Sequence, residues 1–114
     1  MTTAEFRRRG NTWQIRVSGH ADFAEGGHDP VCAACSILAY TLLECAARAE
    51  QRGELYRLQT ETRPGFAALS FTVGKRGEAL HEAVETVRTG YELLARHEPA
   101  HVRVNGFDTV NYLR

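Results

Sequence analysis

The spacing of apolar residues changes period several times along the chain, and this feature limits the possible folds more than any other. In residues 12–18 (TWQIRVS), apolar and polar residues alternate, which is typical of a strand with one buried face. Residues 3–9 (TAEFRRR) precede them across Gly10-Asn11, so the two segments predict a β-hairpin. Residues 54–62 (ELYRLQTET) and 65–73 (GFAALSFTV) predict a second hairpin.

Two longer segments have the period of about 3.6 residues that defines a helix. The first covers residues 30–51 and ends before Gly53, and the second covers residues 78–97 and ends before Pro99. Residues 101–105 (HVRVN) predict a last strand. The predicted order, β-β-α-β-β-α-β, favours an α+β fold in which two helices pack on one face of a small mixed or antiparallel sheet. The 114 residues, 1–114, suffice for a single domain and are too few for two ordinary ones.

Composition and charge argue against several classes of protein. The chain has 14 Lys and Arg against 14 Asp and Glu, so its charge does not indicate a nucleic acid or an anionic membrane as a partner. No apolar run is expected to approach the ~20 residues of a membrane span, and residues 1–10 (MTTAEFRRRG) lack the apolar core of a signal peptide. We therefore expect a cytoplasmic protein, in which the three cysteines remain thiols. The exposed edges of so small a sheet favour a homodimer.

Helical phase separates the cysteines of the first predicted helix. Asp29 is a favoured helix cap and Pro30 a favoured first residue. Cys32 therefore falls in the first turn, where the positive end of the helix dipole would stabilise a thiolate. At about 100° per residue, an apolar stripe is predicted to contain Val31, Cys35, Leu38, Leu42, Cys45 and Ala49. Cys32 and Ser36 lie on the flank of this stripe, so Cys32 is the cysteine that we expect to face a cleft.

Residues 19–36 (GHADFAEGGHDPVCAACS) permit three kinds of site. The possible zinc ligands are Cys32, Cys35, His20 and His28. Structural zinc pairs usually occupy a tight knuckle, however, and no second Cys-x-x-Cys is present. A redox pair of the thioredoxin type would use Cys32 and Cys35, but there a parallel strand leads directly into the motif. The third kind is nucleophilic catalysis with Cys32 as thiolate and His20 as base, which needs no metal and no cofactor. The residue pattern permits contact between the two, because Gly26 and Gly27 are able to take positive φ and fold the strand end back over the helix start.

The same segment resembles a known family of bacterial proteases. GHA, a glycine-containing loop, G-H-D-x-V-C-A and a serine four residues after the cysteine are similar to the motif of the ribosomal-processing cysteine proteases, the Prp family. The resemblance implies a small dimeric α/β domain with a catalytic cysteine and histidine, which here are Cys32 and His20. The family's accompanying Gly, Asp and Ser correspond to Gly19, Asp29 and Ser36. The specific motif covers residues 19–36, and elsewhere the similarity is one of length and element order.

The resemblance also implies a substrate and a reaction. In the Prp family, the enzyme removes a short N-terminal extension from the twenty-seventh protein of the large ribosomal subunit. It cuts after an aromatic residue, and this cut must precede ribosome function. That ribosomal protein is the expected partner. Pro30 departs from the family pattern, which usually has an aliphatic residue there, but proline is compatible with a helix start. The alternative is a non-catalytic ribosome-associated or peptide-binding module that keeps the motif for packing.

Other residues of the segment have roles that the residue pattern leaves open. Asp29 would either cap the helix or orient the histidine, and we favour the cap because it needs only local geometry. Backbone N–H groups at the helix start, including that of Cys32, are candidates for binding the oxyanion of acyl transfer. Phe23, Gly26 and Gly27 belong to a loop that is expected to close over a bound peptide.

Overall fold

The chain forms five strands and two helices within residues 1–24 and 27–106, which the computed structural model describes. In chain order they are β1 (Thr2–Arg9), β2 (Thr12–Ser18), α1 (Pro30–Gln51), β3 (Leu55–Arg63), β4 (Phe66–Val73), α2 (Glu78–His97) and β5 (Val102–Asn105). The predicted element order and the α+β class are confirmed, and both helices have the predicted bounds. Each strand end lies within one residue of its predicted position.

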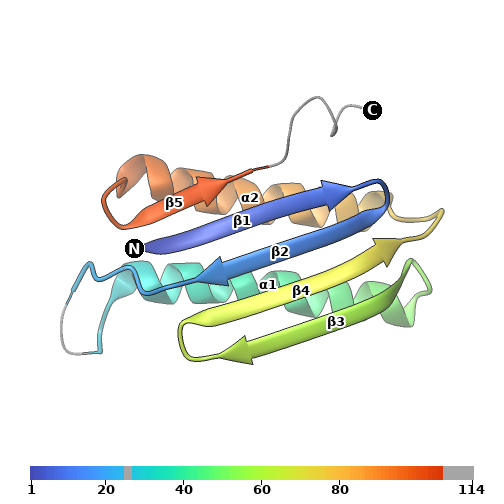
Figure 1. Cartoon of the computed structure of the whole chain (residues 1–114), viewed down its shortest axis with the longest axis horizontal. Helices are drawn as coiled ribbons and strands as arrows, with labels where there is room; N and C mark the ends of the chain where they lie inside the picture. The colour runs from blue at the N-terminus through green and yellow to red at the C-terminus, as the bar shows by residue number, and fades with distance from the viewer. Residues whose placement is uncertain (25–26, 107–114) are drawn as a thin grey trace.

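The strands form one mixed sheet with the order β3-β4-β2-β1-β5 (Figure 1). β1 pairs with β2, β2 with β4 and β3 with β4 in antiparallel fashion, whereas β5 runs parallel to β1. Both predicted hairpins are therefore present. The pairing of β2 with β4 joins the two hairpins, and its last residue pair is Ser18 with Phe66. The loop that follows β2 thus begins next to the β3–β4 turn.

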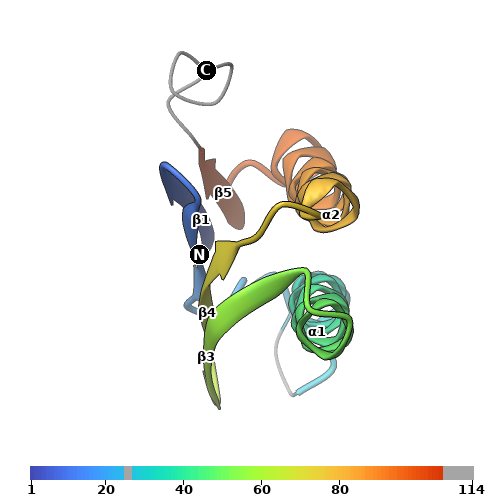
Figure 2. The ribbon, with the colours of Figure 1, turned by 90° about the vertical axis from the view of Figure 1, so that its right-hand side faces the viewer.

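Both helices cover the same face of the sheet, and the core lies between the two layers (Figure 2). The largest fully buried side chains include Trp13, Tyr91, Phe6, Phe71, Ile15, Leu42 and Leu80. Burial of one such side chain is worth ~1.5–3 kcal/mol, so this layer supplies most of the driving force for folding. Alternate residues of β2, Gln14 and Arg16, point to the other face of the sheet and are exposed.

The buried stripe of α1 differs from the predicted stripe at two positions. Val31, Cys35, Leu42 and Ala49 are buried as predicted. Leu38 and Cys45 are only half-buried, and Ala39 and Ala46 occupy the core in their place. Alanine side chains are short enough for the helix to approach its neighbours closely, so they can form the centre of a packed face. Cys45 is therefore not a core cysteine.

Helix α1 is also more apolar than expected. By length and composition alone, Pro30–Gln51 is able to cross a membrane, so the expectation that no run approaches that length is wrong. In the structure, this helix packs against α2 and the sheet through its buried stripe. Its other side includes an exposed ion pair between Glu44 and Arg48, with N and O atoms 3.3 Å apart. The apolar composition of α1 is thus used in the core.

A buried hydrogen bond joins the two helices. The Tyr91 hydroxyl, on α2, donates to the Cys35 carbonyl oxygen, on α1, at 2.7 Å. Burial, together with the nearby Cys35 thiol, raises the pKa of Tyr91, so the hydroxyl stays protonated and able to donate. The Tyr91 ring also packs edge-on against Phe6 of β1, with ring centroids 6.2 Å apart. The turn of α1 that contains Cys35 is thus fixed to α2, which in turn contacts the sheet.

Candidate active site

The end of β2 is held against the β3–β4 turn. The Gly19 N–H donates to the Gly65 carbonyl oxygen at 2.9 Å, one residue beyond the last β2–β4 pair. Gly19 has a φ of +90°, and a Cβ atom there would collide with the Met1 carbonyl oxygen, so the position requires glycine. His20 follows with an exposed side chain that lies against Gly65.

Asp29 caps α1 with one carboxylate oxygen, as predicted, and its other carboxylate oxygen binds the preceding loop. Its Oδ1 accepts the N–H groups of Val31 and Cys32, at 2.9 and 3.0 Å. Its Oδ2 accepts those of Phe23 and Ala24, at 2.8 and 3.2 Å. Partial desolvation raises the pKa of Asp29, but the four backbone hydrogen bonds together outweigh it and hold the pKa below its ordinary value of 3.8. The Cys32 N–H is therefore occupied, and the prediction that it is available to bind an oxyanion is wrong.

Cys32 lies in the first turn of α1, half-buried beside the loop. The Ala21 N–H donates to its Sγ at 3.1 Å. Ala21 is buried, and its carbonyl oxygen lies 2.8 Å from Nδ1 of His101, just before β5. An N–H donor and the positive end of a helix both favour a thiolate over a thiol. The Cys32 sulfur thus lies at the start of α1 and accepts one backbone N–H group.

A cavity of about 430 Å³ brings several of the predicted residues together. Gly19, His20, Cys32 and Ser36 all line it. Residues 62–67, at the β3–β4 turn, form another part of its wall. Tyr40, which is 58% exposed, extends the wall along α1. The candidate nucleophile and the candidate base therefore share one open cavity, of a size that accepts side chains of a peptide.

Cys35 lines the same cavity but is only 4% exposed. Burial, and then the neighbouring Cys32, raise the pKa of Cys35 to about 11. At neutral pH Cys35 is therefore a protonated thiol, which is a poor nucleophile. Its burial agrees with the predicted core position, and the two cysteines of the Cys-x-x-Cys sequence are chemically unequal.

The predicted lid residues do not line this cavity where the structure describes them. Phe23 is 43% exposed and packs edge-on against His101, with ring centroids 5.4 Å apart. Gly27 is exposed and has a φ of +80°. Gly26 lies outside the described residues. The lid stays a prediction.

The zinc and redox alternatives find no support in the geometry. Within residues 1–24 and 27–106, no group of three or more His, Cys, Asp or Glu side chains is placed to hold a metal ion. The proposed ligands Cys32, Cys35, His20 and His28 are therefore not assembled. The redox alternative requires a parallel strand that leads directly into the motif. Here β2 is antiparallel to both neighbours, and a loop separates it from α1.

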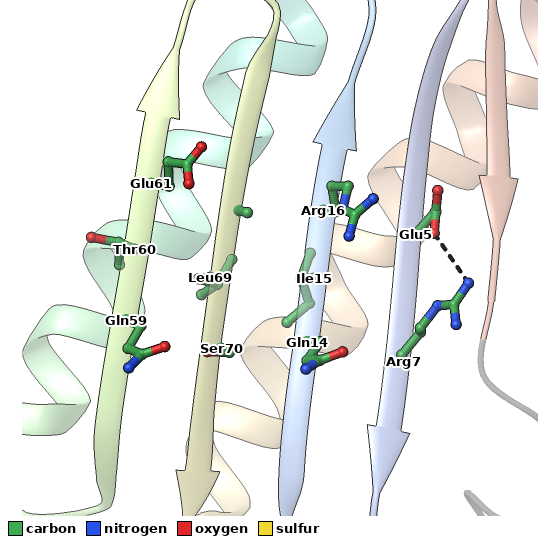
Figure 3. Close-up of a pocket in the computed structure, with 11 residues that line it drawn as sticks. Glu5, Arg7, Gln14, Ile15, Arg16, Gln59, Thr60, Glu61, Leu69 and Ser70 are labelled. Atoms are coloured by element: carbon green, nitrogen blue, oxygen red, sulfur yellow. Dashed lines mark ion pairs between the residues drawn. The ribbon is translucent and has the colours of Figure 1, made fainter.

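A second hollow, of about 370 Å³, lies on the open face of the sheet (Figure 3). Its wall includes Gln14, Arg16, Gln59, Glu61 and the ion pair of Glu5 with Arg7, whose atoms are 3.5 Å apart. The residues that line it include no cysteine and no histidine. The candidate active site is therefore the cavity at Cys32.

Comparison with known proteins decides the family. The family model described as Cysteine protease Prp matches residues 1–103, which is most of the chain. The chain belongs to the Prp cysteine protease family. It is therefore a cysteine peptidase, as predicted. Comparison with curated protein sequences found no significant match.

Solved structures share the fold of this Prp family member. The S. aureus ribosomal processing protease Prp, with a covalently linked product peptide, matches with a TM-score of 0.71 and 16% identity, over 93% of this chain and 99% of that chain. The same protease with a substrate peptide matches with a TM-score of 0.67 and 16% identity, over the same shares. SMU.848 from Streptococcus mutans matches with a TM-score of 0.67 and 26% identity, over 94% of both chains.

Three contributors to the site were not predicted from the sequence. Ala21 donates to the Cys32 sulfur, Gly65 contacts His20, and His101 contacts the Ala21 carbonyl oxygen. Ala21 belongs to the GHA motif of the Prp family and Gly65 follows a proline, so both carry a local signal. His101 lies 80 residues from its partner, and nothing in its neighbourhood along the chain indicates the contact.

Proposed function

We propose that this Prp family member removes the N-terminal extension of the twenty-seventh protein of the large ribosomal subunit, with Cys32 as nucleophile and His20 as base. The observation that carries the proposal is that both side chains line one cavity in a chain of this family. The similar S. aureus structures are described as a ribosomal processing protease with a product peptide or a substrate peptide. This description supports a segment of a ribosomal protein as the substrate.

The proposed mechanism uses His20 and Cys32, which line the cavity, and the Ala21 N–H that contacts the Cys32 sulfur. His20 takes the proton of the Cys32 thiol, and the thiolate attacks the scissile carbonyl carbon. The tetrahedral intermediate then breaks the C–N bond as the His20 imidazolium protonates the leaving amine. Water hydrolyses the thioester, with His20 again as base, and frees Cys32. Before the attack, the Ala21 N–H stabilises the thiolate through its contact with Sγ.

The direct test mixes the purified protein with the precursor of that ribosomal protein and identifies the products by mass spectrometry. We expect one cut, after an aromatic residue, that releases the extension. Cys32→Ala should make no cut, and His20→Ala should cut at a strongly reduced but measurable rate. Cys45→Ala is the matched control, because Cys45 is a half-buried thiol of the same helix that does not line the cavity. Cleavage by Cys32→Ala at the wild-type rate would reject the mechanism. A precursor that binds but stays uncut would favour a non-catalytic module.

Thiol reactivity provides an independent measurement. At neutral pH, iodoacetamide should label Cys32 before Cys45, because Cys32 has the Ala21 N–H and the helix start beside its sulfur. Cys35 should react last, because it is buried and protonated. His20→Ala should slow the labelling of Cys32 only. Equal rates at Cys32 and Cys45 would contradict an activated nucleophile.

We further propose that the protein acts in the cytoplasm as a homodimer. Ile37 and Tyr40 support the dimer, since they are 62% and 58% exposed and lie three residues apart on α1, where their side chains are neighbours. A second copy that covers them would remove apolar surface from water. Sedimentation equilibrium should give twice the 12.7 kDa mass of the chain, and Ile37→Glu should reduce it. A wild-type monomer at all concentrations would reject the dimer.

A further inference from the structure

His20 lies against a residue that has no side chain. A Cβ atom on Gly65 would be 2.7 Å from Nε2 of His20, 3.0 Å from Cε1 and 3.4 Å from Cδ2. The first distance is shorter than non-bonded atoms tolerate, and the second is at the limit. The imidazole ring therefore occupies the space that any other residue at position 65 would need.

The backbone of Gly65 also fixes the chain just before His20. Its carbonyl oxygen accepts the Gly19 N–H at 2.9 Å and so extends the β2–β4 pairing beyond Ser18. Gly65 itself has a φ of +71°, in the left-handed region. The turn is further held by the Arg63 guanidinium, which stacks 3.8 Å from the centroid of the Phe66 ring. Both the ring of His20 and the backbone that carries it are thus placed by the β3–β4 turn.

We propose that Gly65 is a positioning residue for the peptidase reaction, because its missing side chain lets the His20 imidazole lie beside the turn in the cavity that contains Cys32. A general base must come within hydrogen-bond reach of the proton that it takes, so displacement of the ring by a new side chain lowers the rate of the chemical step. This inference rests on the proposed role of His20 as the base.

Two substitutions separate the side-chain effect from the backbone effect. Gly65→Asn adds a Cβ atom, yet asparagine tolerates the left-handed backbone better than most residues, so the variant should fold. Gly53→Asn is the matched control. Gly53 has a φ of +73°, and a Cβ atom there would meet nothing within 4 Å. The two variants share the backbone requirement and differ in whether the new side chain meets His20.

The measurement is kcat and KM for a synthetic peptide that spans the ribosomal extension and its cut. Gly65→Asn should lower kcat about tenfold or more, with KM changed less than about threefold. Gly53→Asn should keep both constants. The NMR signal of the His20 Cε1–H group should shift in Gly65→Asn and stay in place in Gly53→Asn. In the His20→Ala background, Gly65→Asn should not change the residual rate, because the group that it displaces is absent.

Two results would overturn the inference. One is a Gly65→Asn variant with wild-type kcat and an unmoved His20 signal. The other is a further loss of rate from Gly65→Asn in the His20→Ala background, which would show that Gly65 acts through another group. Failure of the proposed function is seen separately, because His20→Ala alone would then cleave the peptide at the wild-type rate.

Discussion

Replacement of Tyr91 by phenylalanine tests how the helix that carries Cys32 is fixed. Tyr91 is fully buried, and its hydroxyl donates to the Cys35 carbonyl oxygen at 2.7 Å. Tyr91→Phe keeps the ring and its edge-on contact with Phe6, so it removes only the hydroxyl and its hydrogen bond. The Cys35 carbonyl oxygen still accepts the helical hydrogen bond from the N–H group four residues later in α1. The substitution therefore isolates one link between α1 and α2.

The expected loss of stability follows from that one bond. A buried hydrogen bond between neutral groups contributes ~0.5–1.5 kcal/mol net, and the small void left by the hydroxyl adds to the loss. We expect the free energy of unfolding to fall by about 1–2 kcal/mol. The entropy of unfolding is ~2.1 cal/mol/K per residue, or ~0.24 kcal/mol/K for the 114 residues. The Tm should thus fall by ~4–8 °C.

Urea unfolding followed by circular dichroism measures the free energy, and a thermal scan at the same protein concentration measures the Tm. Tyr56→Phe is the control, because Tyr56 on β3 is 51% exposed and loss of its hydroxyl should leave both values unchanged. Alkylation of Cys32 should also stay at the wild-type rate, because Tyr91 does not line the cavity. A Tyr91→Phe variant as stable as the wild type would refute the claim that this bond holds the two helices together.

The remaining predictions concern the loop and the cysteines. Asp29→Asn loses the carboxylate oxygen that accepts two loop N–H groups, so it should lower the free energy of unfolding. Because folding lowers the pKa of Asp29, this difference from the wild type should be present above pH 3.8 and shrink below it, as measured by urea titrations at each pH. Folding raises the pKa of Cys35 from 9.0 to about 11. Between pH 9 and 11 the free energy of unfolding of the wild type should therefore fall by up to about 3 kcal/mol relative to that of Cys35→Ala. If the two proteins lost stability in parallel over this range, Cys35 would not be a buried neutral thiol. His101→Phe loses the contact with the Ala21 carbonyl oxygen and should slow iodoacetamide labelling of Cys32; an unchanged rate would show that other contacts hold the loop.

The fold was largely predictable because periodicity reports which face of an element is buried. Trp13 and Ile15 alternate with exposed polar residues on β2, and this pattern alone marks the strand and its inner face. The phase of α1 was harder. Leu38 and Ala39 are both apolar, and the smaller residue, Ala39, is the buried one. The neighbours of the helix, rather than its own composition, decide which side of the helix packs against the core.

The site was predictable where it is local in sequence. Asp29 as cap and the placement of Cys32 in the first helical turn follow from residues that are neighbours along the chain. The loss of the Cys32 N–H to that same cap was missed, since the residue pattern does not show which acceptor an N–H group finds. Gly65 and His101 reach the site only through sheet pairing, so their contacts depend on topology and register that the residue pattern leaves open.

The pairings of β2 with β4 and of β1 with β5 determine when the site is able to assemble during synthesis of the chain. His20 and Cys32 emerge well before β4 and long before His101. Until β4 has paired with β2, His20 has no turn to lie against, and until β5 lies beside β1, His101 cannot hold Ala21 next to the sulfur. On the proposed mechanism, the growing chain therefore carries Cys32 and His20 without an assembled site, and it becomes able to cut other polypeptides only after β5 has been made.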